Sequence, residues 1–443
     1  MVQDRGKTIF EPDTFVQTFA YVAKDDCDTP GDGVLTGYGA AFGRLIFAAI
    51  QSGDGLGKVL ADKITKTIQL ATKRGAPFFF FMNTKGLRLD EGLDAFAGYG
   101  TILQAISQAN NEIPTVCVIG GDCLGIAAVI ASLCDFVIMM NGVSHVSLRT
   151  ALDDQAYANT GISGACGKNG FASIICDEGD YVQRLHQLID YLPDSTYSGT
   201  DNYDGCTDDV NRFCSFCDSL NAEAQYDIRN VISEIADDHS FVELSNNFAP
   251  AVVTAFARFG GTVMGIIANQ SMVNDGVIND SVCRKMASMI HYCDRFSIPL
   301  LTLTNTVGLS DDFDEEKVDF ASVAAFLASS FIQTEIPKLN IIVGKAYGSG
   351  GLLMNSRQTG ADYVYAWNCA RISVGKPETM ALIYCKETIT NASNPVQARE
   401  DALKQYKEQY CKPEVAAQKG YIDDIMIPGE TRARIINFIQ MMA

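Results

Sequence analysis

Residues 348–351, with the sequence Gly-Ser-Gly-Gly, could present backbone N–H groups to a ligand. They follow an apolar stretch, 340–343, that predicts a buried strand, and they precede a segment that predicts a helix opening at Leu352. Glycine adopts backbone angles that other residues resist and leaves peptide N–H groups accessible. A turn at a helix start directs unpaired N–H donors and the helix dipole at one point. That point suits a phosphate or a developing oxyanion, although a purely structural turn would have the same composition.

The elements around this turn occur twice in the chain. The tripeptide Glu-Ile-Pro stands at 112–114 and 335–337, and each copy precedes an apolar strand and a glycine-containing turn (120–125 and 348–351). Matching positions are separated by a nearly constant number of residues along the chain: 226 (Phe15 to Phe241), 222 (Pro77 to Pro299), 223 (Pro114 to Pro337) and 227 (Asp135 to Asp362). A conserved order at a fixed period indicates that one unit was duplicated and fused.

Both copies predict alternating strands and helices. A helix is expected over about 62–72, ending at a basic pair and a glycine, and a fully buried parallel strand over 76–83. In the second copy a helix over 282–296 is expected to bury Val282, Met286, Met289, Ile290, Cys293 and Phe296. The fold class is therefore α/β. A Rossmann sheet is disfavoured because neither turn spells G-x-G-x-x-G after a first strand.

We expect three parts along the chain: an N-terminal domain over 1–190, an acidic linker over 191–221, and a C-terminal domain over 222–443. The middle stretch is rich in Asp, Ser, Gly and Cys, which is typical of a linker and less so of a small inserted lobe. Its C-x-x-C motif, Cys214 to Cys217, has no second pair of ligands nearby. We therefore expect free thiols in a loop and no metal site.

The net charge of −19 and the pI near 4.6 argue against nucleic acid and anionic membrane surfaces as partners. The N-terminal residues lack the apolar core of a signal peptide, and no apolar run reaches the length of a membrane span. The 14 cysteines are scattered through apparent core segments, which is typical of reduced intracellular thiols. We expect a cytoplasmic protein.

Conventional catalytic residues are scarce. The four histidines lie outside nucleophile-elbow and HExxH contexts. Duplicated oxyanion turns with few titrating groups suggest catalysis by backbone N–H donors, for which thioesters and ureas are natural substrates because their enolates carry charge on one oxygen.

The chain resembles the carboxyltransferase subunits of biotin-dependent acyl-CoA carboxylases and decarboxylases, including the propionyl-CoA carboxylase β and methylmalonyl-CoA decarboxylase α subunits. The resemblance extends over nearly the whole chain and is densest in the second half. The segments that carry it are 30–39 (PGDGVLTGYG), 91–100 (EGLDAFAGYG), 256–270 (FARFGGTVMGIIANQ), 293–303 (CDRFSIPLLTL), 345–350 (KAYGSG), 361–367 (ADYVYAW) and 419–435 (KGYIDDIMIPGETRARI).

This resemblance implies two tandem crotonase-like domains, with the acyl-CoA on the N-terminal domain and biotin on the C-terminal one. It implies carboxyl transfer between carboxybiotin and an acyl-CoA, either as propionyl- or acetyl-CoA carboxylation or as methylmalonyl-CoA decarboxylation. Implied partners are a biotin carboxyl carrier protein and a biotin carboxylase or membrane decarboxylase subunit. It also implies a homo-oligomer, from dimer to hexamer, or pairing with a homologous subunit, because the site lies between domains of different subunits.

Carried over by position, the resemblance implies catalytic amides in two pairs and a set of binding residues beside them. The biotin-side pair is Ser349 and Gly350, and the acyl-CoA-side pair is Gly125 and Ile126. The binding residues are Tyr347, Gly348 and Gly351 on the biotin side and Gly86 and Arg88 on the acyl-CoA side.

Two departures leave alternatives open. Ile126 and Lys85 each stand where the family usually has glycine, which favours a catalytically weakened paralogous subunit with an assembly role as a second interpretation. A third is a crotonase-type enzyme that acts on acyl-CoA without biotin, but no carboxylate suited to general acid/base work stands beside either turn.

Overall fold

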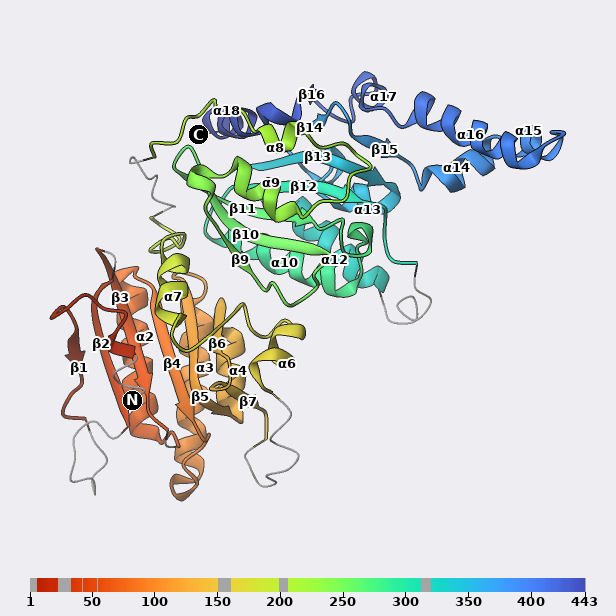
Figure 1. The fold of residues 1–443 in the computed structure, drawn as a ribbon. Helices are drawn as coiled ribbons and strands as arrows, with labels where there is room; N and C mark the ends of the chain where they lie inside the picture. Colours follow the sequence, from red (N-terminus) through yellow and green to blue (C-terminus); the bar gives the residue numbers. More distant parts are fainter. Residues whose placement is uncertain are drawn as a thin grey trace. The chain divides into compact units, whose positions relative to one another are not determined.

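The computed structural model describes residues 6–22, 33–41, 43–53, 55–149, 161–198, 206–311 and 320–442. It divides into two compact units (Figure 1): unit 1 comprises Met1–Asp201 with Ser245–Phe248, and unit 2 comprises Asn202–Leu244 with Ala249–Ala443. The division falls inside the stretch expected to be a linker. The described parts of that stretch are packed, because Tyr191 and Leu192 are buried in unit 1 and Cys214 and Cys217 belong to the core of unit 2.

Unit 1 is built on one mixed sheet with the strand order β1-β2-β3-β4-β5-β6-β8, and β7 pairs with the end of β5. The first three strands are antiparallel and the others join in parallel. The strands are β1 Val16–Thr18, β2 Val34–Ala41, β3 Arg44–Gln51, β4 Phe78–Thr84, β5 Thr115–Leu124, β6 Phe136–Met140, β7 His145–Ser147 and β8 Ile174–Cys176. The helices are α2 Lys58–Arg74, α3 Leu93–Ala109, α4 Ile126–Leu133, α6 Ser163–Lys168 and α7 Tyr181–Ile189.

Unit 2 repeats this topology, with the order β9-β10-β11-β12-β13-β14-β16 and with β15 paired to the end of β13. The strands are β9 Phe241–Leu244, β10 Val252–Phe259, β11 Thr262–Asn269, β12 Leu300–Thr306, β13 Lys338–Tyr347, β14 Tyr363–Trp367, β15 Arg371–Ser373 and β16 Asp424–Met426. The helices are α8 Ser215–Asp218, α9 Ile228–Ile235, α10 Asp280–Arg295, α12 Phe320–Gln333, α13 Gly348–Leu353, α14 Pro377–Tyr384, α15 Lys386–Thr390, α16 Pro395–Tyr410, α17 Pro413–Gln418 and α18 Thr431–Met442. The predicted duplication and the α/β class are confirmed.

Local sequence explains where these elements begin and end. Helix α2 stops at Gly75, whose φ of 69° is left-handed and whose N–H bonds to carbonyls of the last turn. Helix α10 starts at Asn279, whose side chain accepts the N–H of Val282 at 3.0 Å. The six side chains of 282–296 that were predicted to be buried are all buried, and strand β4 is buried on both faces at Phe78 to Phe81.

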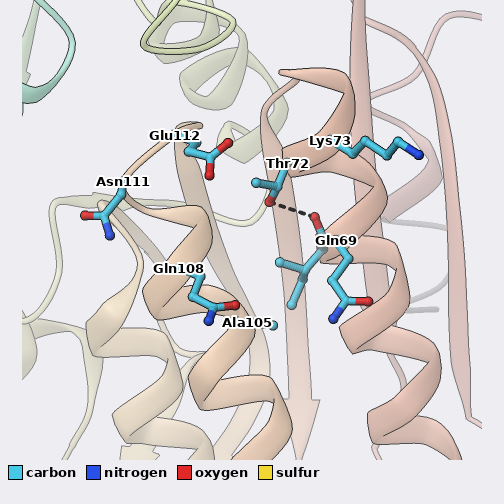
Figure 2. A pocket seen from close by; sticks show the side chains of 8 residues that line it. Gln69, Thr72, Lys73, Ala105, Gln108, Asn111 and Glu112 are labelled. Atoms are coloured by element: carbon cyan, nitrogen blue, oxygen red, sulfur yellow. Dashed lines mark hydrogen bonds between the residues drawn. The ribbon is translucent and has the colours of Figure 1, made fainter.

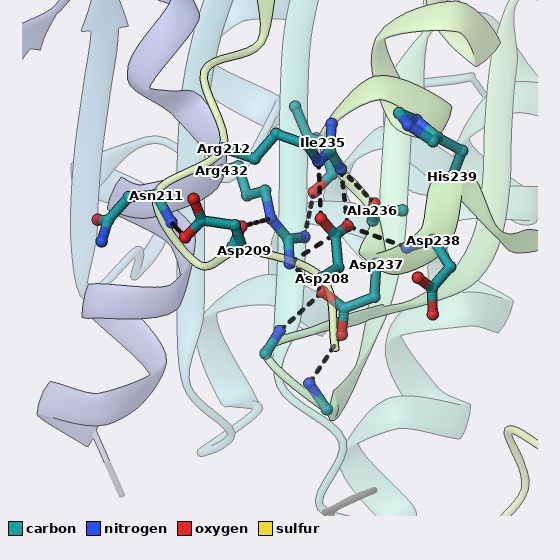
Figure 3. Close-up of polar contacts among 12 residues, drawn as sticks. Asp208, Asp209, Asn211, Arg212, Ile235, Ala236, Asp237, Asp238, His239 and Arg432 are labelled. Atoms are coloured by element: carbon teal, nitrogen blue, oxygen red, sulfur yellow. Dashed lines mark hydrogen bonds and ion pairs between the residues drawn. The ribbon is translucent and has the colours of Figure 1, made fainter. Parts of the chain in front are cut away.

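A buried ion cluster holds the C-terminal helix α18 on unit 2 (Figure 3). Arg432 is fully buried, with its guanidinium 2.6 Å from Asp237 and 3.5 Å from Asp208. It also donates to the carbonyls of Asp209 and Ile235. Arg212 donates to Asp208 at 2.9 Å from the same side. The cluster therefore ties the segment after the unit boundary to the end of the chain.

Candidate active site

The second glycine turn links strand β13 to helix α13. The helix begins at Gly348 and not at Leu352 as expected, so the glycines form its first turn and do not precede it. The first residue, Gly348, has a φ of 55°, and the preceding Tyr347 gives no side-chain cap. Gly350 is packed so closely that a Cβ there would lie 2.7 Å from the Cα of Gly308. The N–H groups of this first turn are left without a capping side chain, as an anion-accepting turn requires.

An asparagine from the neighbouring strand shapes the chain just before this turn. The side chain of Asn305, on β12, accepts the backbone N–H of Lys345 at 3.0 Å, at the point where the ladder between β12 and β13 shifts register. A Cβ on Gly344 would lie 2.5 Å from that side chain, so glycine is required there. Asn83 does the same for Asp122 in unit 1, at 3.1 Å. No local sequence pattern indicates this contact, because it joins residues about 40 positions apart.

The first turn links β5 to α4 and has a different composition. Gly125 has a φ of 63° and donates its N–H to the carbonyl of Ser147 on β7 at 2.7 Å. Ile126 is the first residue of α4, which has no side-chain cap, and its half-buried side chain packs on the core of unit 1. Because Ser147 on β7 accepts the N–H of Gly125, Ile126 is the first residue at the start of α4 whose backbone N–H is not bonded to β7.

The sheet registers show which residues of the two turns correspond. Thr84 pairs with Cys123 in unit 1, and Thr306 pairs with Ala346 in unit 2, an offset of 223 along β5 and β13. Counting on from these pairs, Gly348 corresponds to Gly125, Ser349 to Ile126, and Gly350 to Ala127. The two amide pairs predicted from sequence are consequently displaced by one residue relative to each other.

The binding residues predicted in unit 1 lie on the loop after β4. Gly86 has a φ of 99°, and its carbonyl accepts the N–H of Leu56 at 2.8 Å and the hydroxyl of Tyr99 at 3.0 Å. Burial raises the pKa of Tyr99 to about 12, so this hydroxyl stays a donor at neutral pH. Arg88 is mostly buried and lies 3.3 Å from Glu91. This loop is thus braced internally.

Glu91 serves two groups at once. Besides its contact with Arg88, it accepts the N–H of Lys58 at 2.8 Å and so caps the start of helix α2. Lys85, between strand and loop, is exposed. The structure therefore leaves Lys85 open to solvent and directs Arg88 toward a carboxylate of its own chain.

A cavity of about 660 Å³ adjoins the second turn. Of the residues predicted there, Gly348, Ser349 and Gly351 line it, whereas Tyr347 and Gly350 do not. Sequence reasoning missed most of the remaining wall, which includes Asn340 and Ile342 of β13, Val364, Ile372, and Tyr384, Tyr406 and Tyr410 of the neighbouring helices. The i, i+4 spacing of Tyr406 and Tyr410 was the one available signal, because it places both rings on one helix face.

A second hollow, of about 550 Å³, lies in unit 1 between the C-terminal turns of α2 and α3 (Figure 2). Its wall is polar and includes Gln69, Lys73, Gln108, Asn111 and Glu112. None of the predicted site residues lines it.

Cys214 and Cys217 lie in the core of unit 2 and not in an open loop as expected. Within the described ranges, the other cysteines are also free thiols, and no group of three His, Cys, Asp or Glu side chains is placed to hold a metal ion. None of the described helices is long and apolar enough to cross a bilayer.

Comparison with known proteins identifies relatives over the full length. The sequence model of the family described as "Carboxyl transferase domain" matches residues 1–443. The methylmalonyl-CoA carboxyltransferase 12S subunit of Propionibacterium freudenreichii subsp. shermanii is 29% identical, with 100% of this chain and 88% of the relative covered. The methylmalonyl-CoA decarboxylase subunit alpha of Propionigenium modestum is 31% identical, with coverages of 99% and 89%.

The fold comparison agrees. A crystal structure of the transcarboxylase 12S hexamer assembly, with methylmalonyl-coenzyme A and methylmalonic acid bound, superposes with a TM-score of 0.92 at 28% identity. The match covers 99% of this chain and 88% of that chain.

Proposed function

Because the chain belongs to the carboxyl transferase family, we propose that it moves a carboxyl group between carboxybiotin and an acyl-CoA. The reaction would be propionyl- or acetyl-CoA carboxylation or methylmalonyl-CoA decarboxylation; the relative from Propionigenium modestum is a subunit of a methylmalonyl-CoA decarboxylase. The observation that carries the proposal is the matched pair of strand–turn–helix units, each opening on helix N–H groups without a side-chain cap.

The two units would be tandem crotonase-like domains with separate tasks. We assign the acyl-CoA to unit 1 and the biotinyl group to unit 2, with Gly125 and Ile126 facing the thioester oxygen and Ser349 and Gly350 facing the ureido oxygen. Such donors act on charge that develops in the transition state and need no proton transfer of their own. In unit 1 the amide of Ile126 would be the main hydrogen-bond donor to the thioester oxygen, because the N–H of Gly125 is already donated to the carbonyl of Ser147.

The partners follow from this chemistry. A biotinylated carrier protein would present carboxybiotin, and a biotin carboxylase or a membrane decarboxylase subunit would complete the complex. The 12S relative assembles as a hexamer, and we propose a homo-oligomer in which turns from different subunits face one cleft. Holding both reactants in such a cleft supplies proximity as well as charge stabilisation.

Proline substitution tests the amides directly. Ile126 and Ser349 follow a glycine of positive φ and begin the regular part of their helices. Proline is tolerated at a first helical position and removes the N–H. Ile126→Pro and Ser349→Pro should each lower kcat for methylmalonyl-CoA decarboxylation with free biotin by about 10²–10³.

The matched controls keep the N–H group. Ile126→Ala and Ser349→Ala should retain activity within a few-fold, and all four proteins should give the same circular dichroism spectrum and melting temperature as the parent. Unchanged kcat in either folded proline variant would rule out that amide as an oxyanion donor.

One observation favours a second function, that of a weakened paralogue that serves assembly. A β-branched isoleucine, packed on the core of unit 1, stands where the family usually has glycine, and Arg88 forms an ion pair with Glu91 at 3.3 Å. Absence of turnover with malonyl-, methylmalonyl- and propionyl-CoA by a folded protein that co-purifies with an active homologue would decide for this function.

A further inference from the structure

Two cysteines of unit 2, Cys214 and Cys217, lie together on one helical turn, and neither takes part in the function proposed above. Cys214 is the residue before α8, and Cys217 is the third residue of that helix. The backbone is helical here, because the N–H of Asp218 donates to the carbonyl of Cys214 at 3.1 Å. By helix geometry, Cα atoms three residues apart are about 5 Å from each other, which is within the range that a disulfide spans.

The two thiols also differ in acidity. They are hydrogen-bonded to each other, and this bond lowers the pKa of Cys214 and raises the pKa of Cys217. The backbone of Arg432 and the charge of Arg212 lower the pKa of Cys214 further, against the effect of burial. The neutral Cys214 thiol faces the carbonyls of Arg212 and Glu234 only at 3.8 and 3.7 Å, and a thiol is a weak donor. Cys214 is therefore the sulfur that loses its proton first.

Both sulfurs are buried, but the helix that carries them lies at the surface of unit 2. Ser215 and Asp218 are exposed, and Phe213 is 52% exposed. Helix α8 has only four residues, and it packs against α9 and the turn Pro428–Glu430. A single surface turn opens at a lower free-energy cost than a sheet core. Opening of α8 therefore brings both sulfurs within reach of a small reagent.

Unit 1 contains another pair of neighbouring thiols, Cys117 and Cys134, in a different setting. These thiols are also hydrogen-bonded to each other. Cys117, however, lies within the central strand β5, and Cys134 follows α4. Burial raises the pKa of Cys117 well above its usual value, and Cys134 adds to that effect. Exposure of this pair requires the sheet of unit 1 to open, so it serves as an internal control.

We propose that Cys214 and Cys217 are a site of oxidative modification, where a reversible disulfide forms by exchange with a small disulfide, RSSR. The Cys214 thiolate attacks one sulfur of RSSR, breaks its S–S bond and releases RS⁻. Cys217 then gives up its proton and attacks the Cys214 sulfur of the mixed disulfide, which releases the second RS⁻. Two electrons pass from the protein to RSSR, and the two thiol protons end on two molecules of RSH.

The disulfide would act as a switch and not as a permanent crosslink. It closes a loop of only four residues, which restricts the unfolded chain little. Disulfides of proteins in reducing compartments are usually transient in this way. The inference concerns the two thiols alone and does not rest on carboxyl transfer.

The test uses the full-length folded protein with oxidised glutathione as the probe. Remaining thiols are blocked with N-ethylmaleimide, and the tryptic peptides are analysed by mass spectrometry. Peptide 213–229 contains Cys214 and Cys217 and no other cysteine, so the disulfide appears as this peptide unblocked and lighter by two hydrogen atoms. It should form at least about tenfold faster than a disulfide between Cys117 and Cys134, and dithiothreitol should remove it.

Single serine variants test the order of attack. Cys217→Ser should accumulate glutathione on Cys214, whereas Cys214→Ser should leave Cys217 free over the same time. Circular dichroism and melting temperature should match the parent, and the comparison within the parent decides the proposal even if a serine variant fails to fold.

Absence of the disulfide from peptide 213–229 of the folded parent would overturn the proposal. So would formation no faster than between Cys117 and Cys134, or formation only in urea, since either result would place the chemistry in the unfolded chain. Glutathione on Cys217 of Cys214→Ser, with none on Cys214 of Cys217→Ser, would overturn the assignment of Cys214 as the attacking sulfur.

Discussion

The side chain of Asn305 accepts the backbone N–H of Lys345, three residues before the second glycine turn, at 3.0 Å. The bond crosses from β12 to β13 where their ladder shifts, and it allows β13 to continue toward Tyr347 along a new path. Asn83 and Asp122 repeat it in unit 1. Each asparagine thus positions a turn that it does not belong to.

Asn305→Ala should therefore lower the activity that depends on the turn more than it lowers the stability of the fold. Removal of the acceptor leaves the partly buried N–H of Lys345 unpaired, at a cost of about 1–3 kcal/mol in the free energy of unfolding. Carboxyl transfer should fall by a larger factor than this stability loss explains, because the amides of α13 are no longer held in place. Urea denaturation and the decarboxylation rate would be measured side by side.

Asn83→Ala is the matched variant for unit 1, and the exposed Asn391 offers a control position. Asn391→Ala should leave both quantities unchanged. If Asn305→Ala unfolds more easily yet turns over at the parental rate, the asparagine supports the sheet and not the site.

Gly350→Val should abolish biotin-dependent turnover. The new Cβ would lie 2.6–2.7 Å from backbone atoms of Gly308, and neither backbone segment can yield cheaply. Either α13 or the loop at 308 must shift, and with it the amides of the turn. The large sheet core lies elsewhere, so the far-ultraviolet circular dichroism spectrum should be preserved while kcat is lost.

Gly100→Val is the control for Gly350→Val. Gly100 lies on α3, where a Cβ would meet nothing within 4 Å. Parental activity in Gly350→Val would show that the turn tolerates displacement and would count against its amides as donors.

Much of the fold could be predicted from the sequence, because it depends on patterns within short segments. The run Phe78 to Phe81 predicts a buried strand by composition alone, and the spacing of apolar residues in 282–296 predicts the buried face of α10. The constant offset between Pro77 and Pro299 predicts that both sheets share one topology. In each case local hydrophobic pattern and final burial agree.

The site is harder to predict from the sequence than the fold, because it depends on contacts between residues that are far apart in the chain. The sequence predicts that helix α13 starts at Leu352, four residues after its actual start at Gly348. Glycines favour a turn by propensity, but the packed backbone at Gly308 holds these glycines in a helix. The bond between Gly125 and Ser147 depends on β7, a three-residue strand with no pattern of its own. Asn340 lines the cavity, and the hydroxyls of the two threonines opposite it on β12 donate to its Oδ1. No pattern around Asn340 in the sequence indicates either contact.

Arg432→Met should destabilise unit 2 strongly, by about 3–5 kcal/mol, because it leaves Asp237 and Asp208 without their buried partner. The hydrogen bond from Arg212 lowers the pKa of Asp208. For Asp237, burial raises the pKa, but hydrogen bonds from Gly261, Gly260 and Arg432 outweigh it and the net pKa is lowered.

These shifts set the pH dependence of the cluster. Carboxyls with a lowered folded pKa contribute stability above the unfolded pKa of about 4, and the contribution is lost as pH falls through the folded values. The stability difference between the parent and Arg432→Met, measured by urea denaturation, should thus be full at pH 6 and shrink below pH 4. A difference that stays constant down to pH 3 would show that the effect comes from lost packing.

Lys285 provides the last prediction, in the alkaline range. Its Nζ is buried on α10 and donates to the carbonyl of Val252 at 2.8 Å, as Lys63 of α2 donates to Val34 at 2.7 Å in unit 1. Burial lowers the pKa of Lys285 from 10.5 to about 8, against an opposing effect of Glu243. Between these two values the unfolded chain binds more protons than the folded protein, so stability rises with pH across that window.

The gain at Lys285 amounts to at most about 3.4 kcal/mol between pH 8 and 10.5, at about 1.36 kcal/mol per pKa unit. Lys285→Met removes the titrating group, so its stability should lack this rise even if its value at pH 7 differs for other reasons. The decisive quantity is therefore the slope against pH, taken as parent minus variant from urea denaturation at pH 7.5, 8.5 and 9.5. Parallel curves would mean that Lys285 titrates at its ordinary pKa, and that water reaches the ammonium group in spite of its burial.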